Sequence, residues 1–190
     1  MRLRSCAVIA ALLTAIVLVS PPAEAGRQTT RDAAHDVYRI PAGGTPALAP
    51  DNRNHDIVRA GTVHRGRTLR LWLEVRRLPD AGYVATWDVK TPNRRWVLHR
   101  DTRGGTVYTS LFHFHGPEVL DCDGLRSRAL PRQERVQVTV PRACIGRPRW
   151  IRFGASMGRE TEQVHFIDDA RIDAGFFSGR CRLGPRVRHN

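Results

Sequence analysis

The strongest constraint on the fold of this chain is the alternation of residues between positions 68 and 75. In the segment TLRLWLEV, Leu69, Leu71, Leu73 and Val75 alternate with polar residues and one tryptophan. A period of two places the four apolar side chains on one face of a β-strand, whereas a helix would spread them around its axis. The preceding segment HDIVRAGTVHR is expected to pair with this strand through a turn at residues 65–67.

The same rhythm recurs along the chain. Tyr83, Ala85, Trp87 and Val89 face one way in GYVATWDVK, and RRWVLHRDTRGGTVYTSLFHFHG is expected to form a second hairpin. Three more strands are expected in RVQVTV, PRWIRFGASM and EQVHFIDDARID. After the N-terminal region no segment shows an apolar 3.6-residue period, and PRACIG at 141–146 looks like a single helical turn. We therefore predict an all-β, jelly-roll-like antiparallel β-sandwich of about eight or nine strands.

The N-terminus has the pattern of a secretory signal peptide. Arg2 and Arg4 precede an apolar stretch at 7–19, and Ala-Glu-Ala at 23–25 is a cleavage signal. We expect cleavage after Ala25, with a retained anchor as the alternative, and no other apolar run is long enough to span a bilayer. The chain is thus divided into a signal peptide (1–25), a turn-rich segment with a short strand at 36–40 (26–54), a sandwich body (55–178) and a basic tail (179–190).

Secretion bears on the cysteines, since thiols tend to pair outside the cytoplasm. Cys122, Cys144 and Cys181 remain after the signal peptide. We expect a disulfide between Cys122 and Cys144, which lie at strand and loop ends. The alternative joins Cys144 to Cys181.

The charge is strongly basic, with a formal net charge of +13. Lys90 is the only lysine, and such a bias toward arginine is typical of a GC-rich genome. A basic secreted protein favours polyanions such as acidic wall polymers or lipid head groups. A dedicated nucleic-acid function is not expected.

Several segments together suggest a family. The order HDIVRAGTVHRGRTLRLWLEV, YVATWDVKTP, the stretch from CDGLRSRALPRQERV to WIRFGAS, and HFIDDAR resembles small secreted β-sandwich proteins of high-GC bacteria. Their architecture is similar to family 9 carbohydrate-binding modules and DOMON-type domains. The resemblance implies sugar or haem binding, in some members with a structural calcium. Because Met157 is the only methionine beyond the signal peptide, a Met/His haem pair is not expected.

The first candidate metal site is a set of acidic residues. Asp36, Asp56, Asp168 and Asp169 lie at expected strand ends, and calcium prefers carboxylate oxygens gathered from loops. Capping of turns and pairing with arginines is the alternative for these acids.

His113 and His115 are two apart on an expected strand, a spacing that suits zinc or copper if a further ligand joins them. The alternative is a polar strand end. In that case Phe112 and Phe114 form the core face.

Aromatic residues supply the candidate ligand-binding positions. Trp72 is out of register with the apolar face of its strand, so Trp72, Trp96 and the neighbouring Arg70 are candidates for stacking on and bonding to a sugar. The segment GASMG matches a serine-hydrolase motif, but no amphipathic helix follows it.

These observations predict a secreted, non-enzymatic binding module for carbohydrate or an anionic cell-envelope polymer. The alternatives are a small metal-dependent hydrolase and a structural or partner-binding protein.

Overall fold

The computed structural model describes residues 26–116, 118–171 and 181–190. The expected signal peptide at 1–25 lies outside this part of the chain. None of the helical elements in the described ranges has the length and apolarity needed to cross a membrane.

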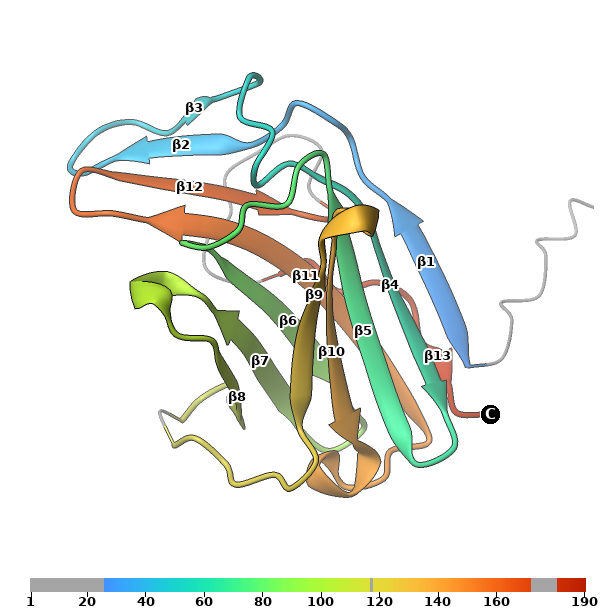
Figure 1. Cartoon of the computed structure of the whole chain (residues 1–190). Coiled ribbons are helices and arrows are strands. Elements are labelled where there is room, and N and C mark those ends of the chain that lie inside the picture. The colour runs from blue at the N-terminus through green and yellow to red at the C-terminus, as the bar shows by residue number, and fades with distance from the viewer. Residues whose placement is uncertain (1–25, 117, 172–180) are drawn as a thin grey trace, which may run out of the picture.

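Two antiparallel sheets pack face to face (Figure 1). The five-stranded sheet has, in spatial order, the strands β1 (Arg27–Arg31), β4 (Ile57–Arg65), β5 (Thr68–Val75), β10 (Arg135–Pro141) and β9 (Arg126–Leu130). The eight-stranded sheet has the order β3 (Ala47–Leu48), β2 (Tyr38–Pro41), β12 (Val164–Asp169), β11 (Trp150–Glu160), β6 (Val84–Lys90), β7 (Arg95–Asp101) and β8 (Tyr108–His113), and β13 (Val187–Arg188) pairs with β11 beside this path. The helical elements of the described ranges are the 3-10 turns η1 (Arg103–Gly105), η2 (Pro131–Gln133) and η3 (Arg142–Ile145).

The predicted all-β sandwich is therefore confirmed, including the helical turn between Pro141 and Gly146. The first hairpin turns at Gly66, whose φ of 57° suits glycine. The described strands outnumber the eight or nine that we predicted. One reason is β1, whose sequence RQTTR has no apolar alternation and joins the sheet through backbone pairing with β4.

The core lies between the sheets. Leu69, Leu71 and Leu73 from β5 face Trp87 from β6 in this layer, and all four are fully buried. Burying one such side chain contributes about 1.5–3 kcal/mol. The periodic residues of the sequence thus supply the energy that holds the sheets together.

Both ends of the described part of the chain are part of the fold. The described residues 181–190 of the expected basic tail pack along β11, where Val187 pairs opposite Ile151. His64 donates its backbone N–H to Gly26 O at 2.6 Å and accepts from Asn190 N at 3.2 Å.

The expected disulfide between Cys122 and Cys144 is confirmed, with Cα atoms 5.7 Å apart. It joins the loop before β9 to η3. Cys181 is a buried free thiol.

Candidate functional site

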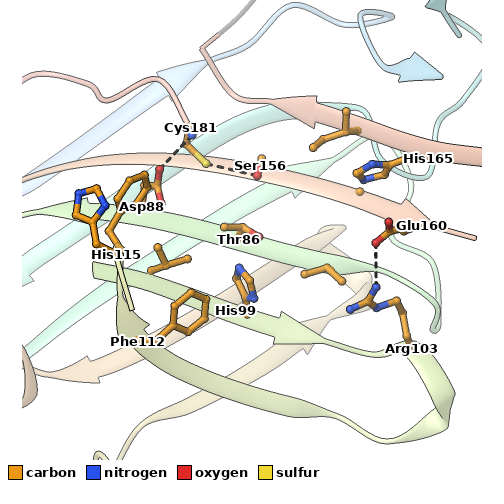
Figure 2. Close-up of a pocket in the computed structure, with 15 residues that line it drawn as sticks. Thr86, Asp88, His99, Arg103, Phe112, His115, Ser156, Glu160, His165 and Cys181 are labelled. Carbon is orange, nitrogen blue, oxygen red and sulfur yellow. Dashed lines mark hydrogen bonds and ion pairs between the residues drawn. The ribbon is translucent and has the colours of Figure 1, made fainter. Parts of the chain in front are cut away.

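The outer face of the eight-stranded sheet is hollowed into a groove of about 580 Å³ (Figure 2). Strands β6, β7, β8, β11 and β12 contribute side chains to it. The polar side chains of its lining are Thr86, Asp88, His99, Arg103, His115, Ser156, Glu160 and His165. A concave site with a few convergent polar groups is the usual form of a ligand pocket.

A row of hydroxyl and imidazole groups crosses the floor of this groove. Ser156 of β11 pairs opposite Thr86 of β6, which pairs opposite His99 of β7. Figure 2 shows the three side chains on the same side of the sheet. Burial lowers the pKa of His99, so its imidazole is neutral at pH 7 and offers one donor and one acceptor nitrogen. The half-buried Thr86 and His99 can both donate to and accept from hydroxyl groups of a ligand, whereas Ser156 is 3% exposed and lies against the Cys181 thiol.

Two phenylalanines border this row. Phe112 meets His99 edge to face at 4.8 Å, and the Arg95 guanidinium lies 3.9 Å from the ring centroid of Phe114. Our expectation that these two rings face the core is wrong, since both line the groove. Leu111, one residue before Phe112, takes the inward position opposite Leu98, so the alternation turns Phe112 outward.

Charged pairs lie at both ends of the groove. Asp88 accepts hydrogen bonds from Arg95 Nη2 at 2.5 Å and from the backbone N–H of Cys181 at 3.1 Å. At the other end, Arg103 pairs with Glu160 at 3.4 Å (Figure 2). Both acids are therefore engaged by arginine.

The chain segment at Cys181 closes one side of the groove because Gly154 leaves room for it. A Cβ at Gly154 would lie 2.6 Å from Arg182 O and 2.7 Å from Cys181 Cβ. The Cys181 thiol lies 3.4 Å from Ser156 Oγ, and burial raises its pKa, so it stays protonated. Ser156, the centre of GASMG, sits within the long strand β11 and not on a strand-to-helix turn, which leaves the hydrolase motif without its mechanical context.

A second polar centre is a cluster of acids where the chain crosses from β1 to β2. Asp32, Asp36 and Asp168 each offer a carboxylate oxygen, and these atoms lie within 4.8 Å of one another. The side-chain oxygens of Asp32 are buried with no hydrogen-bond partner among the described residues. Asp168 accepts from the backbone N–H of Ile57 at 2.7 Å.

Burial and neighbouring charges raise the pKa values of Asp32 and Asp168. Burial, and then repulsion from Asp168 and Asp36, raises the pKa of Asp32 to about 9. Burial, and then repulsion from Asp36, raises the pKa of Asp168 to about 8. Such a cluster either takes up protons or holds a cation, and carboxylate oxygens are the ligands that calcium prefers.

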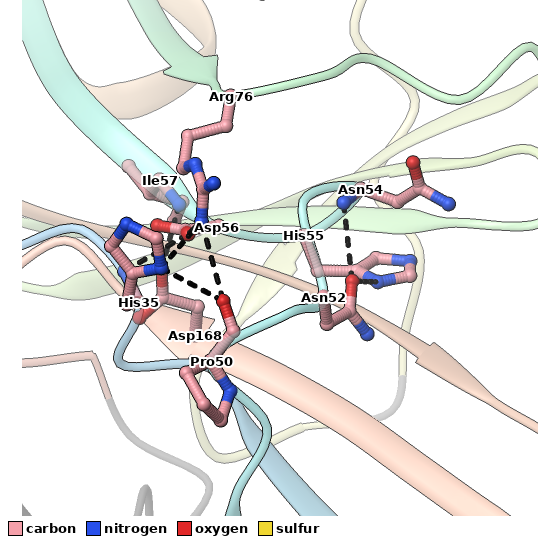
Figure 3. A network of polar contacts seen from close by, with 9 residues as sticks. All are labelled: His35, Pro50, Asn52, Asn54, His55, Asp56, Ile57, Arg76 and Asp168. Atoms are coloured by element: carbon pink, nitrogen blue, oxygen red, sulfur yellow. Dashed lines mark hydrogen bonds and ion pairs between the residues drawn. The ribbon is translucent and has the colours of Figure 1, made fainter.

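Of the four acids predicted for calcium, the structure brings Asp36 and Asp168 together. Asp56 instead forms an ion pair with Arg76 at 2.7 Å and also accepts from the backbone N–H of His35 (Figure 3).

Asp169 lies on the opposite face of β12. It accepts from the backbone N–H groups of Arg171 and Arg182, both at 3.1 Å. Sequence reasoning missed Asp32, since only the crossing between the sheets places it beside β12.

The two histidines proposed for zinc are separated by the end of a strand. β8 stops at His113, whose ring packs on Trp96 at 4.5 Å and whose Nε2 bonds to Arg94 at 3.1 Å. His115 lies past the strand end and lines the groove. Alternation no longer applies there, so the physical reason for a shared ion is lost.

The aromatic candidates differ in exposure. Trp96 is 6% exposed and packs in the core, and it borders a hollow of about 430 Å³ between residues 91–96 and 145–149. Trp72 is half-buried on the outer face of the five-stranded sheet, over Gly61, and the Arg135 guanidinium lies 4.4 Å from its ring centroid. Arg70 is exposed on the same face.

Compared with known protein families, curated proteins and solved structures, the chain matches none of them. Its resemblance to family 9 modules and DOMON-type domains stays a prediction.

Proposed function

We propose that this chain is a secreted, non-enzymatic binding module for carbohydrate or an anionic cell-envelope polymer, and that a sugar chain lies in the groove of the eight-stranded sheet. The supporting observation is the composition of the groove. A row of Ser156, Thr86 and His99 runs beside the ring of Phe112. Sugars present hydroxyl groups at their edges and C–H groups on their faces, so hydroxyls and imidazoles suit the edges and an aromatic ring suits a face.

A hydrolase is the competing function. Hydrolysis of a glycosidic bond requires one carboxyl group that is protonated and one that is ionised, set across the bond. In the groove, Asp88 and Glu160 are each paired with an arginine and lie at opposite ends, so no two carboxyl groups face each other across one bond. Binding without turnover is the better-supported proposal.

Replacement of Phe112 tests the groove. We expect the parent protein to be retarded in gels containing a soluble neutral polysaccharide or on insoluble wall material. Phe112→Ala should weaken this binding by up to about tenfold, since one stacked ring contributes about 0.5–1.5 kcal/mol. Retardation should persist at high salt, because stacking is not screened.

Tyr108→Ala is the matched control. Tyr108 is on the same strand and 63% exposed, but it lies outside the groove lining. Equal binding by the parent and by Phe112→Ala, in proteins with the same near-ultraviolet circular dichroism, would remove the groove from the proposal. Release of reducing ends from the polysaccharide would favour the hydrolase.

A further inference from the structure

The outer face of the five-stranded sheet is covered with arginines. We call this surface the arginine face, defined by Arg27, Arg31, Arg59, Arg65, Arg70, Arg126, Arg128 and Arg135. The strand registers place these residues together: Arg31 lies opposite Arg59, Arg59 opposite Glu74, and Glu74 opposite Arg135. Because alternate residues share a face, all eight side chains point away from the core.

The five strands contribute a single acidic side chain to the arginine face. Glu74 is the only acidic residue in the five strands, and it accepts hydrogen bonds from Arg59 Nε at 2.7 Å and Arg135 Nε at 2.9 Å. Burial opposes ionisation of Glu74, but these two arginines hold its pKa below the ordinary value. Among the described residues, the side chains of the other six arginines form no hydrogen bond or ion pair. The surface therefore has a large excess of positive charge.

Three of these arginines form a straight row across the sheet. Arg27 lies opposite Val63, Val63 opposite Arg70, Arg70 opposite Thr139, and Thr139 opposite Arg126. This pattern puts a guanidinium on every second strand. Neighbouring strands are about 4.8 Å apart, so the charges repeat at roughly 10 Å. That interval is close to the length of one disaccharide in an extended chain.

The row ends in a cavity. Arg27, Arg65 and Arg70 line a hollow of about 460 Å³, together with Gly26 and Asn190, the first and last described residues. Three guanidinium groups around one hollow offer several N–H donors to a single anionic group. Arginine binds carboxylate through two parallel hydrogen bonds, which adds geometric specificity to charge.

Trp72 lies at the centre of the arginine face, on the middle strand of the sheet. Its indole lies where a Cβ on Gly61 would be, 2.2 Å from the ring atom Cζ2, so only glycine fits beneath it. The Arg135 guanidinium is held between this ring and Glu74. A flat platform with a stacked arginine thus lies at the centre of the arginine face.

We propose that the arginine face binds a linear polysaccharide that carries carboxylate groups. The site lies on the opposite sheet from the groove and does not rest on the function proposed for the groove. Of the described residues, the large exposed apolar side chains all lie off this face (Leu48, Val107, Tyr108 and Val119), so the face lacks an exposed apolar patch that could enter a bilayer. A sheet face without a protruding helix or ribbon also lacks the element that enters a duplex groove. An extended polyanion that lies across the strands fits the row.

The test uses polygalacturonate as the probe and replaces the row. In the variant Arg27→Gln/Arg70→Gln/Arg126→Gln, we expect affinity measured by titration calorimetry at low salt to fall at least about tenfold. Each lost contact releases one counterion fewer, so the slope of log K against log salt should decrease by about 3. The control Arg53→Gln/Arg77→Gln/Arg149→Gln removes the same charge from exposed positions outside the five strands.

The outcomes separate the arginine face from general charge and from the groove. The proposal is supported if the control triple keeps affinity within about threefold and the row triple is retarded by neutral polysaccharide like the parent. It is overturned if both triples lose affinity equally, because net charge alone would then explain binding. It is also overturned if duplex DNA or phosphatidylglycerol vesicles bind more tightly than polygalacturonate with the same dependence on the row.

Discussion

His64 is a neutral imidazole enclosed by the two ends of the described chain. It is fully buried on β4, and its ring packs edge to face on His189 at 5.1 Å. Burial, and then the charges of Arg142 and His189, lowers its pKa to about 4. The unfolded chain therefore binds a proton at His64 more readily than the folded chain. This difference in proton binding has no effect on stability above pH 6.5. Below that pH, the folded state loses stability as the pH falls toward 4.

We accordingly expect His64→Gln to flatten the acid side of the stability profile. The free energy of unfolding from urea titrations should fall between pH 6.5 and 4 by on the order of 2 kcal/mol more in the parent than in the variant. His115→Gln, at an exposed position beside the groove, is the control and should keep the parental slope. Parallel profiles for the parent and His64→Gln would contradict this account.

At the same scale, the sequence predicted the inward residues well and the outward ones poorly. Leu69, Leu71 and Leu73 are buried as their alternation required. Trp96 and Phe112 follow the same period-two rule, but their environments depend on which face of the sheet is covered. Period-two alternation assigns residues to the two faces of a strand, but it does not show which face packs against the other sheet. Aromatic residues occur on both faces and therefore do not decide this.

At the scale of secondary-structure elements, the disulfide ties η3 and the loop before β9 together. Cys122 and Cys144 are 22 positions apart. Closing a loop of this length contributes about 3 kcal/mol, chiefly by restricting the unfolded chain. We expect Cys122→Ser/Cys144→Ser to lose about that much free energy of unfolding while retaining the sandwich.

Reducing agent provides the check on this prediction. The parent in dithiothreitol should unfold at the urea concentration of the double variant, and the variant itself should not respond to the reagent. A parent that is indifferent to reduction, with both thiols shown to be free by alkylation, would contradict the stabilising role. The buried Cys181 does not enter this comparison, since it is present in both proteins.

Strands whose own sequence has an apolar alternation or a glycine turn were predicted. Strands that depend on backbone pairing with a neighbouring strand were not. The hairpin of β4 and β5 has an apolar alternation and a glycine turn. β1 and β13 have neither, because they pair through the backbone at sheet margins. The acid cluster was predicted in part for the same reason: strand ends mark Asp168, but the position of Asp32 follows from a crossing between sheets that leaves no local pattern.

At the scale of the whole molecule, the acid cluster lies at the junction of the two sheets. Asp32 follows β1 of one sheet, and Asp168 belongs to β12 of the other. A calcium ion that binds only the folded state stabilises it by mass action. At a calcium concentration one hundred times the dissociation constant, the free energy of unfolding rises by about 2.7 kcal/mol, and the unfolding midpoint rises with it. We expect thermal unfolding in excess calcium to occur several degrees higher than in chelator.

Asp32→Asn should abolish the response to calcium, and Asp80→Asn, at an exposed acid, should retain it. Identical midpoints of the parent in chelator and in calcium would exclude the cation. A rise with zinc that disappears in His113→Ala would restore the histidine hypothesis.

The bonds of His64 to Gly26 and Asn190 have a consequence for the speed of folding. The edge of the five-stranded sheet is complete only when both ends of the described chain have reached one residue of β4. Similarly, the backbone N–H of Ile57 donates a hydrogen bond to Asp168, which lies 111 positions further along the chain. Contacts this distant require large loops to close before any of them stabilises the chain, so we expect this protein to fold slowly, as other domains of high contact order do. The arginine-lined cavity, which both ends border, is then among the last surfaces to form.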